Sequence, residues 1–175
     1  MTEMEGVLLR APDVERDAPF AHGWFTRPEG RDTLLQMGNA ESEIEESTLD
    51  GERKIMQEFL DLECENKQVT RVITKDGKTI GVVWIELFMN HNVEAPSIHI
   101  MIGDPDYRGK GIGRFAMNWA IDYVRDQTSY TTIYTRHLAN NIPIAKLNES
   151  LGFMKIGDVY TDDKGLVWQR VMLAL

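Results

Sequence analysis

The sequence predicts a mixed α+β domain, and three features of the chain indicate this fold class. Two runs rich in β-branched residues, VTRVIT (69–74) and TIGVVWIELF (79–88), flank an Asp-Gly pair, which is a strong signal for a β-hairpin. A glycine-rich turn, DPDYRGKGIGR (104–114), joins a strand pattern to an amphipathic helix pattern. The chain closes with a second hairpin pattern around TDDKG (161–165).

The N-terminal part is predicted to contain one short strand and then helices. Residues 6–10 form an apolar strand-like run, and residues 13–36 have a helical pattern interrupted by Pro19, Pro28 and Gly30. Residues 48–66 have an apolar stripe at helical spacing, formed by Leu49, Ile55, Met56, Phe59, Leu60 and Cys64. Cys64 is therefore expected in the core and not as a nucleophile.

The C-terminal part alternates between strand and helix patterns. A strand is expected at 97–102, a helix at 111–126, a strand at 131–137 and a helix at 143–152. Residues 153–160 and 166–173 are expected to form the closing hairpin.

Length and composition point to one soluble domain spanning 1–175, with 42% hydrophobic residues and no apolar run near the ~20 residues that cross a membrane. The acidic start lacks the features of a signal peptide, and the single cysteine excludes an internal disulfide, so we expect a cytoplasmic protein. The net charge of −9 argues against nucleic-acid binding and fits a cationic substrate. The acidic run at 39–47 has no accompanying histidine and predicts a solvated loop, so no metal is expected.

The glycine-rich turn requires an explanation because glycine weakens both helices and strands. A P-loop does not fit, since five residues separate Gly103 from Gly109 where the motif has four, and Gly111 follows Lys110 where Ser or Thr is needed. Gly111, Gly113 and Ala116 match the G-x-G-x-x-G/A pattern of a dinucleotide-binding turn. However, such a turn should follow its strand directly, and here the segment DPDYRGK lies between them. A helix N-terminus with bare backbone N–H groups is nevertheless suited to a pyrophosphate.

Two segments together resemble a known family. Arg108-x-x-Gly111-x-Gly113 follows a strand and opens a helix, and NIPIAKLNESLGF (141–153) places an asparagine after a strand, then a short helix, then Leu-Gly-Phe. Both are similar to motifs of the GNAT N-acetyltransferases, over about residues 69–160. The details resemble the branch that contains ribosomal-protein N-terminal and aminoglycoside acetyltransferases.

The resemblance implies a mostly antiparallel sheet whose fourth and fifth strands splay apart, with helices on both faces and acetyl-CoA in the gap. Backbone groups of Ile102 and Gly103 would pair with the pantetheine amides, and Asn141 would hold the cofactor arm. The other residues expected to bind acetyl-CoA are Arg108, Gly109, Lys110, Gly111, Ile112, Gly113 and Arg114.

The strand at 97–102 is implied to border the acceptor amine, which must lose a proton before it attacks the thioester. His99 on this strand is predicted to be the general base, with Glu86 on the adjacent strand orienting it or serving as the base itself. A hydrogen-bonded core histidine is the alternative. A backbone N–H near Met101 or Ile102 would polarise the thioester carbonyl.

Many members of the family have a tyrosine seven residues after the motif asparagine, where it protonates the leaving thiolate. This chain has Asn148 there, and an amide is not a general acid, so water or another residue must supply the proton. Direct attack in a ternary complex is expected, because nothing indicates a covalent enzyme intermediate.

The expected reaction is acetyl transfer to a primary amine of an aminoglycoside, a polyamine or a protein N-terminus. Trp24, His91 and Glu94 are candidates for walls of the acceptor site. The alternatives are a non-catalytic GNAT-fold module that binds acetyl-CoA and, less favoured, a dinucleotide-dependent enzyme. A homodimer is also among the expectations.

Overall fold

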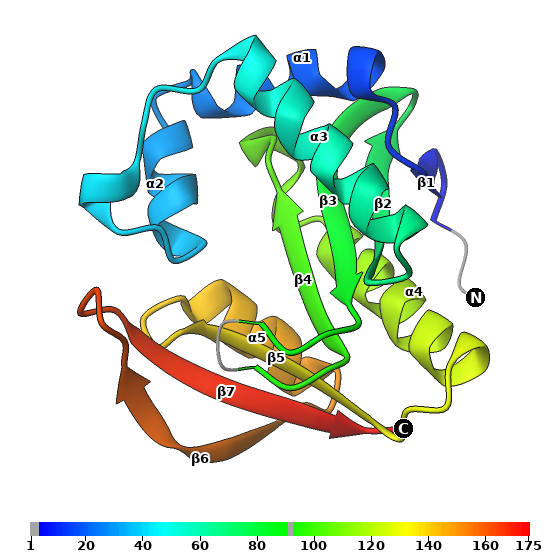
Figure 1. The fold of residues 1–175 in the computed structure, drawn as a ribbon, viewed down its shortest axis with the longest axis vertical. Coiled ribbons are helices and arrows are strands. Elements are labelled where there is room, and N and C mark those ends of the chain that lie inside the picture. The colour runs from blue at the N-terminus through cyan, green and yellow to red at the C-terminus, as the bar shows by residue number, and fades with distance from the viewer. Residues whose placement is uncertain (1–3, 91–92) are drawn as a thin grey trace.

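The computed structural model describes residues 4–90 and 93–175. A seven-stranded sheet runs through the molecule in the order β1-β2-β3-β4-β5-β7-β6, and helices cover both of its faces (Figure 1). The strands are β1 (Val7–Arg10), β2 (Gln68–Lys75), β3 (Lys78–Glu86), β4 (Ser97–Ile102), β5 (Thr132–Leu138), β6 (Met154–Thr161) and β7 (Val167–Ala174). The helices are α1 (Val14–Phe25), α2 (Gly30–Gln36), α3 (Leu49–Cys64), α4 (Ile112–Gln127) and α5 (Ile142–Ser150), with short 3₁₀ turns η1 (Glu41–Glu43) and η2 (Pro105–Tyr107).

The predicted fold class is confirmed, including the separation of two strands within the sheet. All neighbouring strands are antiparallel except β4 and β5, which are parallel and pair only at Ser97 and Tyr134. The N–H of Tyr134 donates to the carbonyl of Pro96 at 2.9 Å, and no further pairing follows along β4. The two strands therefore leave a gap in the middle of the sheet (Figure 1).

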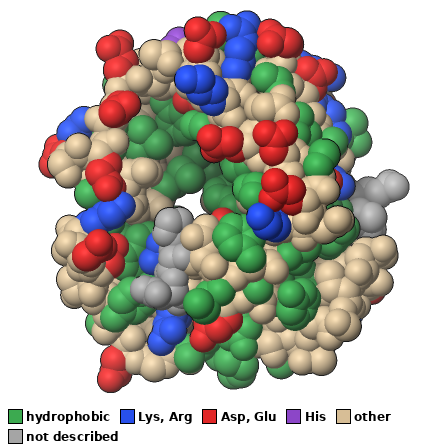
Figure 2. Space-filling view, in the orientation of Figure 1, with side chains coloured by type: hydrophobic (Ala, Val, Ile, Leu, Met, Phe, Trp, Pro, Cys, Tyr) green, Lys and Arg blue, Asp and Glu red, His purple; other side chains and the backbone are tan. Residues whose placement is uncertain are grey.

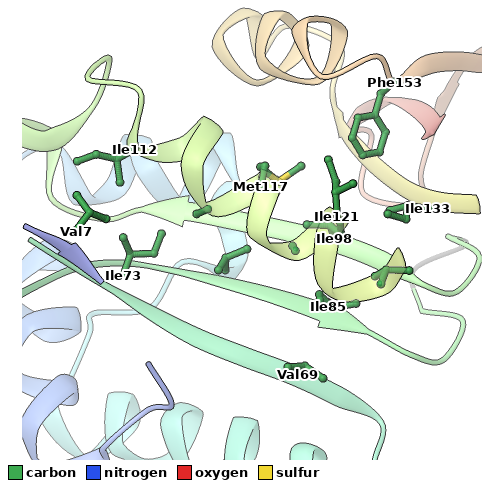
Figure 3. Packing of buried hydrophobic residues seen from close by; sticks show 14 of the residues in the cluster. Val7, Val69, Ile73, Ile85, Ile98, Ile112, Met117, Ile121, Ile133 and Phe153 are labelled. Atoms are coloured by element: carbon green, nitrogen blue, oxygen red, sulfur yellow. The ribbon is translucent and has the colours of Figure 1, made fainter. Parts of the chain in front are cut away.

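The larger hydrophobic core lies between the sheet and α4. Met117 and Ile121 of α4 pack with Ile73, Ile85 and Ile98 of the sheet, and the same cluster reaches β5 and the chain after α5 through Ile133 and Phe153 (Figure 3). Their side chains are at most 6% exposed, and burial of apolar area on this scale is the main favourable term in folding. This core fixes α4, and hence the glycine turn before it, against β4.

A second apolar cluster lies on the opposite face of the sheet. Ala18, Ala21 and Trp24 of α1 and Met56 of α3 pack against Val82 and Met101 of the sheet. The N-terminal helices thus cover the face of β4 that carries Met101, while α4 covers the other face.

Two expectations for the N-terminal helices are corrected. Pro19 lies inside α1 and does not interrupt it, and the helical region breaks at residues 26–29 instead. Cys64 is exposed, because the buried side of α3 is formed by Glu52 and Met56 and the last turn lies outside the core. Ile55, also expected in the apolar stripe, is 42% exposed.

Across residues 4–90 and 93–175, no helix is both long and apolar enough to cross a membrane.

Candidate functional site

A cavity of about 720 Å³ lies where β4 and β5 separate. Figure 2 shows the surface hollowed between the N-terminal helices and the C-terminal strands, with hydrophobic side chains gathered at the upper left of the hollow. The cavity is lined from both sides of the sheet by residues of α2, β4, the glycine turn, α4, β5 and α5. It therefore passes through the sheet at the gap.

The glycine turn is anchored by a buried acid at its start. Asp104 has no exposed surface, and its carboxylate accepts hydrogen bonds from Lys78 Nζ at 2.7 Å and Arg27 Nη1 at 3.1 Å. Burial alone would raise the pKa of Asp104, but the hydrogen bonds and charges of Lys78 and Arg27, with the N–H of Asp106, hold this pKa below its ordinary value. The turn is thus tied to β3 and to the loop after α1.

The helix that follows begins without a side-chain cap. Gly111 is the N-cap of α4, with φ of +80°, and it offers no side-chain oxygen to the first N–H groups. These groups have no partner within the helix by construction, and the helix dipole adds positive potential there. Gly109, at φ of +71°, is so open that a Cβ added to it would have no neighbouring atom within 4 Å, and the turn thus exposes bare backbone. Such an N-terminus fits a pyrophosphate.

The predicted cofactor-binding residues divide into two groups in the structure. One group lines the cavity and consists of Ile102, Arg108, Gly109, Gly111, Gly113, Arg114 and Asn141. Gly103, Lys110 and Ile112 do not line it. The side chain of Ile112 lies in the core, and Gly103 packs against Trp24 of α1, where any side chain would collide with the indole ring.

Arg108 has a different position from the one expected for a phosphate ligand. Its Nε donates to the carbonyl of Ile102 at 2.9 Å, and its Nη2 donates to Thr33 Oγ1 of α2 at 2.9 Å. These hydrogen bonds of the guanidinium link the end of β4 to α2. Arg108 also lines the cavity.

The edge of β4 that faces the gap can be assigned from the strand pairing. Backbone groups of successive residues in a strand point to opposite edges. The carbonyl of Pro96 accepts a hydrogen bond from β5, so the backbone N–H and C=O groups of Ile98, Ile100 and Ile102 also point toward β5 and face the gap. The backbone groups of Met101 point the other way, toward Val82 on β3. The backbone donor expected near Met101 or Ile102 is thus available at Ile102.

His99 and Glu86 are brought together, as the sequence predicted. Nε2 of His99 lies 3.5 Å from Oε2 of Glu86 and 3.0 Å from Oγ of Ser97. The imidazole is stacked on Trp84 with the ring centroids 5.0 Å apart, and Trp84 Nε1 donates to Glu86 Oε1 at 3.3 Å. Stacking and hydrogen bonds thus fix the orientation of a histidine that lines the cavity.

Glu86 is buried and remains the acidic partner of this group. Burial would raise the pKa of Glu86, but the close approach of His99 and the hydrogen bond from Trp84 lower this pKa below its usual value. Glu86 is therefore ionised at neutral pH, and its carboxylate faces Nε2 of His99.

Two asparagines of the later motif have contrasting surroundings. Asn141 caps α5 by accepting from the N–H of Ile144 at 3.4 Å, and its Nδ2 donates to the carbonyl of Gln36 at 3.2 Å. Asn148 lines the cavity and is only 2% exposed, yet neither its Nδ2 nor its Oδ1 has a hydrogen-bond partner among the described residues. A buried amide without partners is costly and indicates a site for a polar ligand.

Several cavity residues were not predicted as site residues. They include Gln36 of α2 and Met37 just after it, Thr135, Arg136 and His137 of β5, and Trp168 of β7. Arg136 and Trp168 lie on strands whose pairing the sequence alone does not reveal. Of the expected acceptor-site residues, Trp24 is buried in the core, Glu94 is exposed and 4.0 Å from Arg170, and His91 lies outside the described residues.

Within the described part of the chain, no group of three or more His, Cys, Asp or Glu side chains is arranged to hold a metal ion. The expectation that no metal takes part stays a prediction.

Comparison with known proteins identifies relatives of the whole fold. The family described as "Acetyltransferase (GNAT) domain" matches residues 7–154. The chain is 25% identical over 156 residues to an N-acetyltransferase 9-like protein of Nematostella vectensis, covering 86% of this chain and 76% of the relative. It is also 33% identical over 91 residues to the uncharacterized protein MJ1062 of Methanocaldococcus jannaschii; that match covers 52% of this chain and only 19% of the relative.

Solved structures agree on the fold at low sequence identity. A ribosomal L7/L12 α-N-protein acetyltransferase in complex with coenzyme A has a TM-score of 0.81 at 15% identity, covering 98% of this chain and 96% of that one. A spermidine N-acetyltransferase of Vibrio cholerae in complex with CoA and spermine has a TM-score of 0.71 at 20% identity, covering 98% and 96%.

Proposed function

Because this chain belongs to the GNAT acetyltransferase family, we propose that it transfers the acetyl group of acetyl-CoA to a primary amine by direct attack within a ternary complex. The family makes acetyl-CoA the co-substrate, which supplies an acyl group activated as a thioester. The observation that carries the proposal is one cavity with an uncapped helix N-terminus on one side of the sheet gap and the His99–Glu86 pair on the other.

Binding of acetyl-CoA is supported by three features of the chain. The N–H groups at the start of α4 face the position for a pyrophosphate, and Arg114 lines the same wall. The free edge of β4 offers backbone groups at Ile100 and Ile102 that can pair with amides, as an added strand would. Lys110 remains in the proposal as a charge beside the turn, and Asn141 as a polar group at the start of α5.

We assign to His99 the role of the general base that accepts the proton of the acceptor amine. With Glu86 ionised, the hydrogen on Nε2 of His99 faces Ser97 and Glu86, so Nδ1 carries the lone pair toward the acceptor. Glu86 orients the ring and stabilises the positive charge that His99 gains when it accepts the proton. The N–H of Ile102 donates to the carbonyl oxygen of the acyl group, where negative charge increases during attack.

We assign to Asn148 the role of binding the sulfur of CoA as it leaves the acetyl group. Its amide can donate a hydrogen bond to a thiolate, although it cannot supply the proton. The absence of partners for both of its polar atoms among the described residues, in a wall of the cavity, supports this role.

The acceptor is limited here to a primary amine, with an aminoglycoside, a polyamine and a protein N-terminus as its possible carriers. The charge of −9 predicted a polycation, but the described residues that line the cavity include no carboxylate and include Arg108, Arg114 and Arg136. The acidic residues that give the chain its negative charge thus lie outside the described lining of the cavity. We therefore do not propose that the site prefers polycationic amines. A single domain over 1–175, a cytoplasmic location, a homodimer and the absence of nucleic-acid binding stay predictions.

The proposal is tested by measuring thiol release from acetyl-CoA with a panel of primary amines. We expect release that depends on the amine, with acetylation at nitrogen confirmed by mass spectrometry. Calorimetric binding of acetyl-CoA without amine-dependent release would favour the non-catalytic module. Binding of a nicotinamide dinucleotide in place of CoA would favour the dinucleotide-dependent enzyme.

A further inference from the structure

The two strands that separate around the cavity carry His99 and Arg136 at equivalent positions. Ser97 on β4 pairs with Tyr134 on β5, and His99 and Arg136 are each two residues further along these parallel strands. Because side chains alternate between the faces of a sheet, both lie on the face that carries Ser97 and Tyr134. Both also line the cavity. The gap thus has the proposed base on one side and a guanidinium on the other.

The guanidinium of Arg136 is held in a fixed orientation. Its carbon Cζ lies 3.8 Å from the centroid of the Trp168 ring, and its Nη1 donates to the hydroxyl of Tyr160 at 3.1 Å. Trp168 is itself buried and donates from Nε1 to Asp162 at 2.8 Å. A guanidinium positioned in advance in this way loses little conformational freedom when it binds an anion.

The charge of Arg136 has no direct acidic partner in the described part of the chain, where no carboxylate oxygen lies within 4.0 Å of the guanidinium. The acid beside Trp168 is Asp162, whose oxygens accept from the backbone N–H groups of Lys164 at 3.0 Å and Leu166 at 2.8 Å as well as from the indole. These bonds hold Asp162 in the turn between β6 and β7.

A second arginine lies directly opposite on the neighbouring strand. Arg136 and Arg170 are cross-strand partners in β5 and β7, so two positive charges share one face of the sheet. The acid paired with Arg170 is the exposed Glu94, 4.0 Å away. Like charges at directly opposite positions destabilise a sheet. Their presence beside the cavity of a chain with a net charge of −9 indicates a function in binding a negative group.

We propose that Arg136 forms a subsite for an oxyanion group, a carboxylate or a phosphate, carried by the acceptor amine. A planar guanidinium binds either group through paired hydrogen bonds. An anion bound there while the amine faces His99 would place the acceptor across the gap, which makes Arg136 a determinant of substrate specificity. The inference rests on the proposed acetyl transfer for the identity of the ligand.

The experiment uses the full chain and matched pairs of short peptides with a free N-terminal amine and an amidated C-terminus. One pair differs by Asp against Asn at the second position, and the other by phosphoserine against serine, so the two arms separate carboxylate from phosphate. The value of kcat/KM is measured for the wild type, for Arg136→Gln and for Arg125→Gln. Arg125 is an exposed arginine near the end of α4, far from the cavity lining, and serves as the matched removal of one positive charge.

We expect the wild type and Arg125→Gln to favour at least one of the anionic peptides by about tenfold, as for a close charge pair at an interface. Arg136→Gln should abolish this preference and leave the affinity for CoA unchanged. Equal kcat/KM for charged and neutral peptides in the wild type, in both arms, would overturn the proposal. The proposal would also be overturned if Arg136→Gln lowered kcat/KM equally for the charged and the neutral peptide of each pair.

Binding without turnover separates this proposal from the proposed function. In the presence of CoA, which carries no acetyl group, the same peptides are titrated by calorimetry. Selective binding of an anionic peptide that Arg136→Gln abolishes would support the subsite even if no peptide is acetylated. Equal binding of all four peptides by the wild type, or binding of none, would reject the subsite even if other amines are acetylated.

Discussion

Nε2 of His99 lies 3.5 Å from Oε2 of Glu86, and the two residues are on adjacent antiparallel strands. Trp84 contacts both, since its ring is stacked on the imidazole and its Nε1 donates to the carboxylate. The pair is therefore held from two directions, which is the arrangement from which we propose that His99 acts as the base. The predictions begin from this arrangement.

Replacing His99 by Ala should remove the base without removing the cofactor site. We expect turnover at pH 7 to fall by about 10²–10⁴-fold, the usual contribution of a positioned base, while the Kd for acetyl-CoA is unchanged. Turnover should recover in part at high pH, because a larger fraction of the amine, with a pKa of about 10, is then deprotonated. Steady-state rates from pH 6 to 10 test this, and a variant that matches the wild type throughout would exclude His99 as the base. Glu86→Gln should give a smaller loss, since it removes orientation and charge but leaves the imidazole.

Gly113 offers a direct test of the helix N-terminus as the cofactor site. An added Cβ would lie 3.5 Å from Leu147 and 3.9 Å from Ile100, an ordinary contact distance, and Gly113 does not have positive φ. Gly113→Ala should thus retain or raise stability by about 0.4–1 kcal/mol while weakening acetyl-CoA binding by about tenfold or more.

The matched control for Gly113→Ala is Gly77→Ala in the turn between β2 and β3. Gly77 has open space around it but φ of +82°, so this variant should lose stability and bind acetyl-CoA normally. Thermal unfolding and calorimetry on the two variants check the contrast. Unchanged affinity in a folded Gly113→Ala protein would argue against the pyrophosphate site.

Asn148→Leu should separate activity from stability. The substitution removes a buried amide that has no partner among the described residues and replaces it with an apolar group of similar size, so we expect stability to rise by about 1 kcal/mol. Turnover should fall by about tenfold or more because the leaving sulfur loses a donor. Asn118→Leu, at an exposed position on α4, should leave turnover unchanged. A loss of stability in Asn148→Leu would show that Asn148 has a structural role.

Acid should destabilise the protein through Asp17 and Asp104, both of which have lowered pKa values in the fold. Burial opposes the shift at each site, but hydrogen bonds and charges from Arg10 at Asp17, and from Lys78 at Asp104, outweigh it. A carboxyl with a lowered folded-state pKa contributes stability above its unfolded pKa, near 3.9, and this contribution is lost as pH falls through the folded pKa.

The free energy of unfolding should accordingly decrease as pH falls below about 4. Asp104→Asn should make this decrease shallower, because one of the carboxyls with a lowered pKa no longer titrates. Denaturant titrations from pH 7 to 3 measure both slopes. Equal slopes in the variant and the wild type would contradict the assignment.

The sequence predicts much of the fold because local signals are strong in this chain. The Asp-Gly pair at 76–77 marks the β2–β3 hairpin, and the glycines at 109–113 mark the start of α4. Cys64 and Ile55 were misplaced because burial along a helix depends on which neighbours pack against it, and these partners are distant in the sequence.

The candidate site was predictable only where a motif names its residues. His99 and Glu86 follow from strand alternation and adjacency, which the hairpin order supplies. Arg136 and Trp168 could not be placed, because the order β5-β7-β6 puts β7 between two strands that precede it in the chain. The backbone of Gly103 was predicted to pair with the pantetheine amides, and contact with Trp24 explains why this residue has no side chain.

The single pairing between β4 and β5 also determines which amide hydrogens exchange with solvent. In most sheets the central strands are the best protected, whereas here the N–H groups of Ile100 and Ile102 lie at the centre of the sheet on an edge without strand pairing. Their deuterium uptake should be fast in the free protein and slow with CoA, which would act as an inserted strand. Uptake at Val83, inside the paired region between β2 and β4, should be slow in both states. Ligand binding would then be read out as protection in the middle of the sheet.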